Sequence, residues 1–267
     1  MDRDLLVEAV LASGVVLPAP GHGFLRLQAA AADENAGPRE LAAAVSQDPA
    51  MTGALLRVAN SPVFRPRSAP RSAQDAIAML GRTRTLATAA STALKSHSAG
   101  LDNKAIECLW SASAHAADLA YAVCRATPFR ALADTAYLAA LMQDAGIAVL
   151  LRRAPEHASL LHVTGAALEA GARAIDALTC SDHAAAGFLV ARNWKLPIEV
   201  CEAIRAHHEP AMALRLGDNS RRIALLLATG RRLRDGASPD WTDWAGPVEA
   251  ELGLTEAALD QVSADQR

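Results

Sequence analysis

The sequence predicts an all-α protein built as a two-lobed helical bundle. Alanine and leucine dominate its apolar half, whereas aromatic residues make up only 4% of the 267 residues. This composition favours helices, because both residue types have high helix propensity. No segment alternates polar and apolar residues as a strand would, and most Pro, Gly, Ser and Asp clusters fall where a helix would begin or end.

The first lobe is expected over residues 15–100, after an N-terminal extension at residues 1–14. Asp48 can cap a helix whose first position is Pro49, where the missing N–H costs nothing. Ser72 and Asp75 have the spacing of a capping box. We expect helices over residues 24–32, from Pro38, from Pro49 to Asn60, from Ser72 to a C-cap at Gly81, and over residues 83–95.

The second lobe is expected over residues 101–215, with C-terminal helices at 216–267 packing on it. Its longest apolar run, at residues 136–151, is too short to cross a membrane. We expect Trp241 and Trp244 to cover the body of the protein. The expected helices lie at 105–125, 131–152, 155–162, 166–178, 181–193, 197–207, 219–233 and 255–262.

Charge and cysteine content exclude several classes of protein. The net charge of -3 and the pI near 6.2 give no basic surface for nucleic acid. The arginine pairs at 152–153, 221–222 and 231–232 are interpreted as solvated helix faces. Four isolated cysteines without a Cys-x-x-Cys motif fit a reducing compartment, and the N-terminus has no basic leader. We therefore expect a cytoplasmic protein that binds neither nucleic acid nor a membrane.

The pair Gln143–Asp144 carries the main functional signal. It interrupts an apolar helical run, and a buried carboxylate is costly unless a partner compensates its charge. Asp144 therefore has either a structural role, accepting hydrogen bonds from a neighbouring helix, or a role in a ligand pocket. We favour the structural role.

Several motifs, in order, resemble the HDOD family of bacterial output domains, which are related to HD phosphohydrolases. The stretch from Ser46 to Phe64 resembles the family signature, and Ser72–Gly81 resembles the pattern that follows it. In the second lobe, Tyr137–Gly146 and Asp182–Gly187 fall in the family's order. The resemblance covers roughly residues 15–215, and Trp194-x-Leu-Pro197 and Ile204-x-x-His207-His208-x-Pro210 complete it.

The resemblance also implies that a metal site has been lost. An HD phosphohydrolase uses His and carboxylate ligands to bind a metal that activates water. Its first His would fall near Ala112 and the His of its doublet on Gln143, whose amide is a much weaker donor. Asp144 is retained, but the late carboxylate expected near residues 228–229 is absent.

The histidines leave alternatives open. His183, and His207 or His208, stand where other ligands of the related enzymes could lie. Adjacent helical residues diverge by about 100°, so we expect at most one of His207 and His208 to face the pocket. We expect no metal; if one binds, its ligands would be Asp144, His183 and His208. In the first lobe, capping alone explains the signature stretch, although Leu55, Leu56 and Val63 could form a partner surface.

The resemblance implies a non-catalytic bacterial signal-transduction protein that acts by binding a signalling protein, within a cyclic-di-GMP or two-component pathway. No cofactor is expected, and the oligomeric state is not predicted. One competing hypothesis is a metal-dependent phosphohydrolase or phosphodiesterase with an atypical site. Another is a nucleotide-sensing module without hydrolysis. The sequence contains no Gly-rich phosphate loop and no nucleophile elbow that would indicate other enzyme classes.

Overall fold

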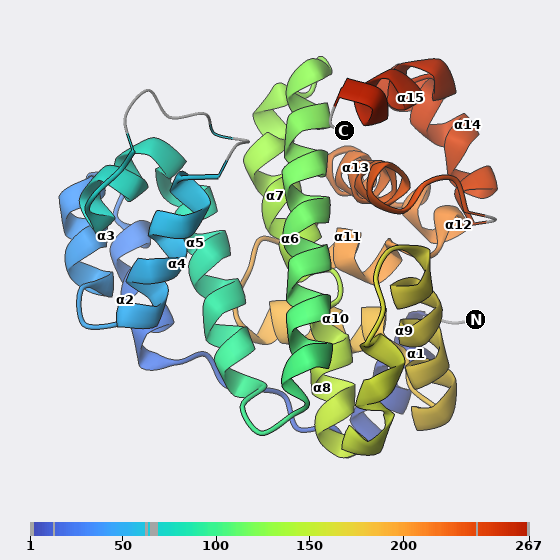
Figure 1. Ribbon diagram of the computed structural model, residues 1–267, viewed down its shortest axis with the longest axis horizontal. Helices are drawn as coiled ribbons and strands as arrows, with labels where there is room; N and C mark the ends of the chain where they lie inside the picture. Colours follow the sequence, from blue (N-terminus) through green and yellow to red (C-terminus); the bar gives the residue numbers. More distant parts are fainter. Residues whose placement is uncertain (1–2, 13, 62–63, 65–68, 239, 266–267) are drawn as a thin grey trace. The chain divides into compact units, whose positions relative to one another are not determined.

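The computed structural model describes residues 3–12, 14–61, 64, 69–238 and 240–265. Within these residues the secondary structure is helical throughout and contains no strand, which confirms the all-α prediction (Figure 1). The chain divides into a small unit, Pro18–Ala99, and a large unit formed by Met1–Leu17 together with Gly100–Arg267.

The described residues of the small unit form four helices, and the helix starts follow the local rules. The Asp48 carboxylate accepts a hydrogen bond from the Met51 N–H at 3.0 Å, and Ser72 and Asp75 form the reciprocal capping box. Gly81 has a φ of 75°, and this non-helical residue breaks the last segment where a C-cap was predicted. The helices are α2 (His22–Ala32), α3 (Pro38–Val45), α4 (Pro49–Ala59) and α5 (Ala73–His97).

Packing inside the small unit is apolar. Phe24, Leu27, Leu55 and Ile77 are buried almost completely. Helix α5 packs against α2, α3 and α4. Because Leu55 is fully buried, it cannot belong to an exposed partner surface. Val63 lies outside the described residues.

The large unit is built around α6, which packs against α7 and α13 (Figure 1). Helix α10 packs against α8 and α11, and α11 also contacts α7 and α13. The N-terminal helix α1 packs on α10, and α14 and α15 cover α13. The elements are α1 (Arg3–Ala12), α6 (Asn103–Ala126), η1 (Arg130–Leu132), α7 (Ala133–Met142), α8 (Ala145–Arg153), η2 (Pro155–Leu161), α9 (Ala166–Thr179), α10 (His183–Asn193), α11 (Ile198–Ala206), α12 (Pro210–Ala213), α13 (Asp218–Asp235), α14 (Trp241–Leu252) and α15 (Glu256–Asp265).

Two sequence predictions for the large unit were wrong. The single helix expected over residues 131–152 is two helices, α7 and α8, which meet at Gln143–Asp144. Helix α14 was not predicted; it contains Pro247 and buries one face through Trp241, Trp244, Val248 and Leu252. The two tryptophans therefore do cover the body of the unit, as expected.

The segment Arg130–Arg153 is long and apolar enough to cross a membrane by composition, but 83% of its most apolar window is buried. Burial of this kind is typical of the core of a soluble protein.

Candidate functional site

Asp144 lies at the junction between α7 and α8. Its backbone, with φ of -97° and ψ of 10°, leaves the helical region, so it occupies the N-cap position of α8. Gln143 is fully buried and Asp144 is 9% exposed. The junction therefore places one amide and one carboxylate inside the large unit.

Two glycines allow the helices around this junction to approach closely. A Cβ atom on Gly146 would lie 2.0 Å from the carbonyl oxygen of His183, which no side chain tolerates. A Cβ atom on Gly187 would lie 3.1 Å from Ile204 in α11. The small residues thus bring the starts of α8 and α10 and the end of α11 together.

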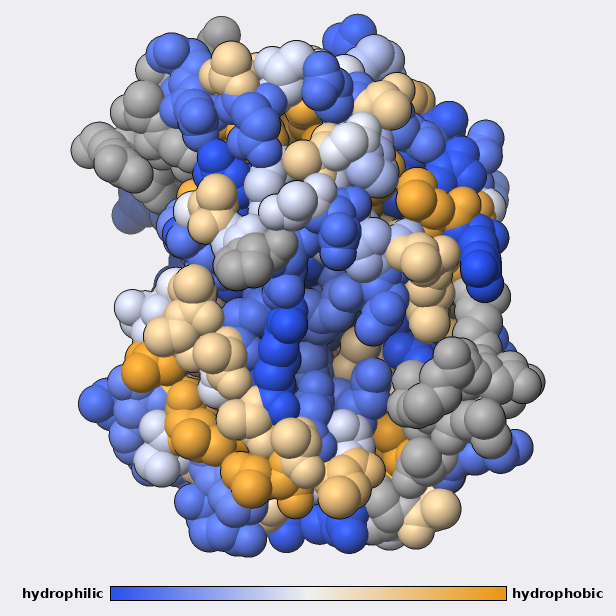
Figure 2. All heavy atoms as spheres, turned by 90° about the vertical axis from the view of Figure 1, so that its right-hand side faces the viewer, coloured by the Kyte–Doolittle hydropathy of each residue, from blue (hydrophilic) through white to orange (hydrophobic). Residues whose placement is uncertain are grey.

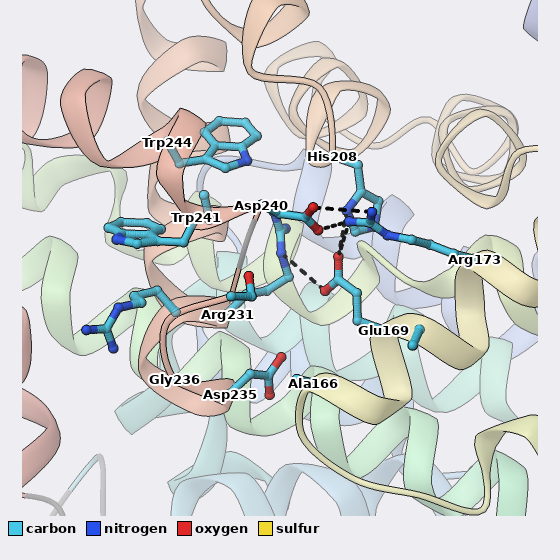
Figure 3. A pocket seen from close by; sticks show the side chains of 14 residues that line it. Ala166, Glu169, Arg173, His208, Arg231, Asp235, Gly236, Asp240, Trp241 and Trp244 are labelled. Atoms are coloured by element: carbon cyan, nitrogen blue, oxygen red, sulfur yellow. Dashed lines mark hydrogen bonds and ion pairs between the residues drawn. The ribbon is translucent and has the colours of Figure 1, made fainter.

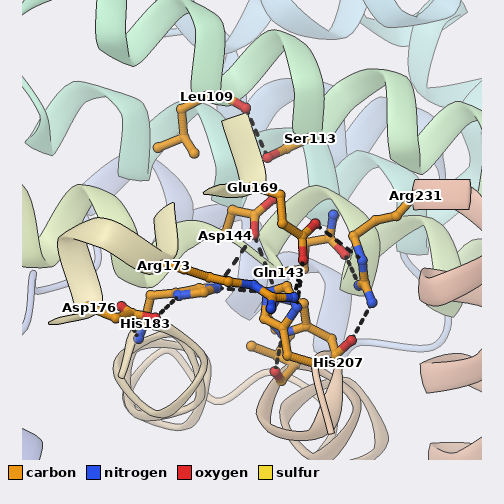
Figure 4. A network of polar contacts seen from close by, with 12 residues as sticks. Leu109, Ser113, Gln143, Asp144, Glu169, Arg173, Asp176, His183, His207 and Arg231 are labelled. Carbon is orange, nitrogen blue, oxygen red and sulfur yellow. Dashed lines mark hydrogen bonds and ion pairs between the residues drawn. The ribbon is translucent and has the colours of Figure 1, made fainter. Parts of the chain in front are cut away.

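Three histidines converge on Asp144 at this point (Figure 4). The Asp144 Oδ1 atom lies 3.6 Å from His207 Nε2 and 3.9 Å from His183 Nε2. His183 Nε2 also lies 3.0 Å from His208 Nε2. One donor atom from each of the four residues lies within 4.8 Å of every other.

Each imidazole is held at its Nδ1 atom by an acceptor outside the cluster. His183 Nδ1 lies 2.6 Å from Asp176 Oδ2, and His207 Nδ1 lies 2.6 Å from the Ile204 carbonyl oxygen. His208 Nδ1 lies 3.0 Å from Glu169 Oε1. A carboxylate or a carbonyl only accepts hydrogen bonds, so each Nδ1 carries a proton. The Nε2 atoms of all three rings therefore point inward.

Burial and neighbouring charge set the protonation of the cluster. Burial lowers the pKa of His207 and, together with the nearby His207 and Arg231 side chains, lowers the pKa of His208 well below its usual value. Burial also lowers the pKa of His183, but the hydrogen bond and charge of Asp176 outweigh it, so the net shift is upward.

Asp144 stays ionised in this environment. Burial by itself raises its pKa, but the neighbouring His207, His183 and Arg234 side chains hold the pKa well below the usual range. The closer of the two neighbouring imidazole nitrogens, His207 Nε2 at 3.6 Å, is too distant for a hydrogen bond.

A buried guanidinium occupies the side of the cluster next to Gln143. Arg231 Nη1 donates to Gln143 Oε1 at 3.3 Å, and Nη2 donates to the His207 carbonyl oxygen. Its Nε atom lies 3.8 Å from Glu169 Oε2. Arg231 is only 8% exposed, so the interpretation of this arginine as part of a solvated face was wrong.

A second arginine holds the backbone at Ala112. Arg234 Nη1 donates to the Ala112 carbonyl oxygen at 3.3 Å, and its guanidinium pairs with Asp235 at 2.6 Å. Arg234 and Asp144 line the same small cavity. The Ala112 side chain brings no donor to the histidine cluster.

The prediction that only one of His207 and His208 faces the pocket was wrong. Their ring centroids lie 3.9 Å apart, and both belong to the cluster. Helix α11 ends at Ala206, so His207 is a C-cap residue and His208 lies in the turn before Pro210. The angular spacing of a regular helix no longer applies there.

Sequence reasoning missed Glu169 and Asp176, which orient two of the histidines. Both lie on α9, seven residues apart, with Arg173 between them. That spacing puts all three side chains on one face of the helix. A row of charged residues on a helix that is otherwise rich in alanine could have indicated from the sequence that this face contacts other polar groups.

Two cavities border the cluster. One, of about 270 Å³, includes Glu169, His208 and Arg231 together with Trp241 and Trp244 (Figure 3). The other, of about 240 Å³, includes Asp176, His183 and His208. An ion pair between Arg173 and Asp240 lies beside both. Figure 2 looks at the side of the large unit that carries α9 and α14, where hydrophilic residues surround a hollow.

The donor set fits a transition metal better than a hard cation. Imidazole nitrogens with one carboxylate are typical ligands of Zn²⁺, Fe²⁺, Co²⁺ and Ni²⁺, whereas Mg²⁺ and Ca²⁺ prefer oxygen. Metal-binding histidines usually donate their second ring N–H to a carboxylate or carbonyl, as all three do here. Among the described residues His207 Nε2 is buried without a hydrogen-bond partner, so its lone pair is available to a metal ion.

The HDOD domain family matches residues 17–210 of this chain. The chain belongs to the HDOD family. This confirms the resemblance inferred from the motifs of both lobes. No curated protein matches the sequence.

Several solved structures share the fold of this HDOD protein at low sequence identity. An HDOD domain protein of unknown function from Geobacter sulfurreducens is 21% identical, with a TM-score of 0.70 and coverage of 99% of this chain and 94% of the other. A protein from Shewanella amazonensis SB2B, provisionally named a metal-dependent phosphohydrolase, is 19% identical with a TM-score of 0.67 and 99% coverage of both chains. A protein from Marinobacter aquaeolei VT8, provisionally named a signal transduction protein, is 22% identical with a TM-score of 0.69; the match covers 99% of this chain and 63% of the other.

Proposed function

We propose that this HDOD protein is a non-catalytic signal-transduction module that regulates a partner protein by binding it. The family membership and the likeness to a protein named for signal transduction support this function. The observation that carries the proposal is that two arginines bond at Gln143 and Ala112: Arg231 donates to the Gln143 side chain and Arg234 to the Ala112 carbonyl oxygen. Gln143 and Ala112 stand where the related enzymes would have histidines.

Arginine side chains supply positive charge, but they cannot activate a water molecule as a metal ion does. A metal ion lowers the pKa of a bound water and so creates a nucleophile near neutral pH. A guanidinium has no coordination position for water and stays protonated in proteins. Because the Gln143 amide oxygen accepts from Arg231, it is also committed to a hydrogen bond that a metal ligand would have to break.

A hydrolysis assay tests the non-catalytic part of this proposal. Purified protein is supplied in turn with Mn²⁺, Fe²⁺, Co²⁺ and Zn²⁺ and incubated with a phosphomonoester, a phosphodiester and a cyclic dinucleotide. We expect no turnover above that of the Asp144→Asn variant. Turnover that requires metal and disappears in Asp144→Asn would refute the proposal.

The binding part is tested with defined components. Cross-linking in the native cells identifies candidate signalling proteins, and each candidate is then purified and titrated against the full chain. We expect one of them to bind at a fixed stoichiometry. If no cross-linked candidate binds the pure chain, the partner hypothesis fails.

A further inference from the structure

The contact between His183 and His208 requires a cation between the two rings. Both Nδ1 atoms carry protons, because each faces a carboxylate. In two neutral rings the Nε2 lone pairs would then face each other at 3.0 Å. Either an additional proton or a metal ion must lie there.

A proton explains that contact but leaves His207 unexplained. His207 is fully buried, and its Nε2 atom has no hydrogen-bond partner although it points toward Asp144. Leaving a buried acceptor unpaired costs about 1–3 kcal/mol. A metal ion shared by His207, Asp144, His183 and His208 satisfies every one of these atoms at once.

The net charge around the cluster matches a divalent ion. With neutral imidazoles, four carboxylates are opposed by two guanidinium groups, which leaves a formal charge of -2. The pairs Arg234–Asp235 and Arg205–Asp182 are each neutral and do not change this sum. The carboxylates are Asp144, Glu169, Asp176 and Asp240, and the guanidinium groups are Arg173 and Arg231.

We propose that Asp144, His183, His207 and His208 bind a single divalent first-row transition-metal ion. Ligands about 2.1 Å from a metal and about 90° apart are separated by about 3.0 Å, and wider angles give larger separations. The distances of 3.0, 3.6 and 3.9 Å between donor atoms fall in this range. The set needs neither Ala112 nor Gln143; it keeps three positions where the resemblance places ligands and adds the second of the adjacent histidines at the end of α11.

The ion has an acidic access path. The cavity of about 240 Å³ that reaches His183 and His208 is lined by more carboxylates than guanidinium groups. A cleft with negative walls concentrates cations near its end. The acidic residues are Asp176, Asp182, Glu209, Asp240 and Asp243, and the basic ones are Arg173 and Arg205.

The bound ion links three separate elements of the large unit. Asp144 begins α8, His183 begins α10, and His207 and His208 follow the end of α11. Metal binding therefore stabilises this region and gives the module a metal-dependent state. This inference does not depend on the proposed function, since an ion can bind without hydrolysis.

The test uses full-length protein without a histidine tag, stripped of metal by a chelator that is then removed. Isothermal calorimetry with Zn²⁺, and the visible absorption of bound Co²⁺, measure affinity and stoichiometry. We expect one equivalent to bind, and the thermal unfolding midpoint to rise with the ion. Mg²⁺ should produce neither effect.

Matched variants locate the site. His207→Ala and Asp144→Asn should weaken Zn²⁺ binding more than about 100-fold, because each removes a ligand. Asp176→Ala should weaken it about 10- to 100-fold by releasing the His183 ring, and Asp176→Asn should restore part of that loss. His157→Ala, a histidine in η2 outside the cluster, should bind like the wild type.

Two outcomes would overturn the inference. One is the absence of stoichiometric binding of Zn²⁺ and Co²⁺ to folded wild-type protein. The other is binding that persists in both His207→Ala and Asp144→Asn. If circular dichroism shows that a variant does not fold, the Co²⁺ spectrum of the wild-type protein still tests the inference. A spectrum identical to that of aqueous Co²⁺ would contradict binding by imidazole ligands. Failure here leaves the non-catalytic proposal intact, and observed hydrolysis would refute that proposal without touching the metal site.

Discussion

Gly146→Ala tests whether the close approach of α8 and α10 builds the site. The new Cβ would lie 2.0 Å from the His183 carbonyl oxygen, 2.6 Å from the Gly187 nitrogen and 2.9 Å from the His183 carbonyl carbon. Ordinary contacts begin at 3.4 Å, so the shortest of these is too close by 1.4 Å. All three atoms belong to the backbone and cannot rotate away, so the two helices must separate.

The expected cost follows from the backbone contacts. Overpacking a buried position costs about 1–3 kcal/mol, and a clash with backbone belongs at the upper end. We expect Gly146→Ala to reduce the free energy of unfolding by about 3 kcal/mol, measured by urea denaturation with far-ultraviolet circular dichroism. Because His183 begins α10, the same variant should also weaken Zn²⁺ binding.

Gly246→Ala is the matched control. Gly246 lies inside α14 of the same unit, and a Cβ there meets nothing within 4 Å. The higher helix propensity of alanine is offset by Pro247, whose ring crowds the Cβ of the preceding residue, so the free energy of unfolding should change by less than about 1 kcal/mol. A Gly146→Ala protein as stable as the wild type would show that α8 and α10 do not approach as described.

Three further predictions concern other parts of the chain. Gln143→His alone should not produce metal-dependent phosphodiester hydrolysis, because Ala112 and Arg231 remain. Turnover by this variant would contradict the proposal that the protein is non-catalytic. Arg82→Ala should destabilise the small unit by about 2 kcal/mol. The Arg82 guanidinium donates hydrogen bonds to the carbonyl groups of Ala31, Asp33, Glu34 and Ala36 at the end of α2 and just after it. Urea denaturation measures the loss, and Arg26→Ala, which removes a single hydrogen bond of 3.4 Å, is the control. Burial raises the pKa of Glu169, but His208 and Arg231 outweigh it and hold that pKa well below the usual range. The folded state thus binds the Glu169 proton more weakly than the unfolded state, so this stabilisation is present above about pH 5 and is lost as the pH falls. Glu169→Gln should therefore flatten the acid-side loss of stability between about pH 5 and 3 relative to the exposed control Glu156→Gln, and equal slopes would contradict this reasoning.

Local sequence signals predicted most helix boundaries, because the side chains that set them act within a few residues. Asp48, Ser72 and Gly81 each perform the capping or breaking role that their residue types indicate. The break at Gln143–Asp144 could not be predicted in this way. The run is buried on all sides and contains neither Gly nor Pro at the break, so its apolar pattern is continuous. The contact of α8 with α10 at Gly146, which lies just after the break, involves a segment far away in the sequence.

Helix α14 was missed for the opposite reason. Gly246 and Pro247 indicate a turn by local rules, yet burial of Trp241, Trp244 and Val248 outweighs the cost of a proline inside the helix. The candidate site could likewise be predicted only in part from local sequence. Asp144, His183 and the His207–His208 pair could be selected from sequence motifs, but the roles of Glu169, Asp176 and Arg231 depend on contacts between distant segments.

If the protein is non-catalytic as proposed, the arrangement of Arg231 explains how the fold is kept without a hydrolytic centre. A buried cluster of carboxylates needs positive charge, and Arg231 is one of the groups that supply it to Asp144 and Glu169. Arg231, with Nε 3.8 Å from Glu169 and Nη1 bonded to Gln143, supplies that charge permanently. Charge compensation alone, however, does not require three imidazoles whose Nδ1 atoms are all held from outside and whose Nε2 atoms all point inward. In the proposed function the arginine explains the absence of hydrolysis, whereas the inward orientation of all three rings is explained by the proposed metal ion.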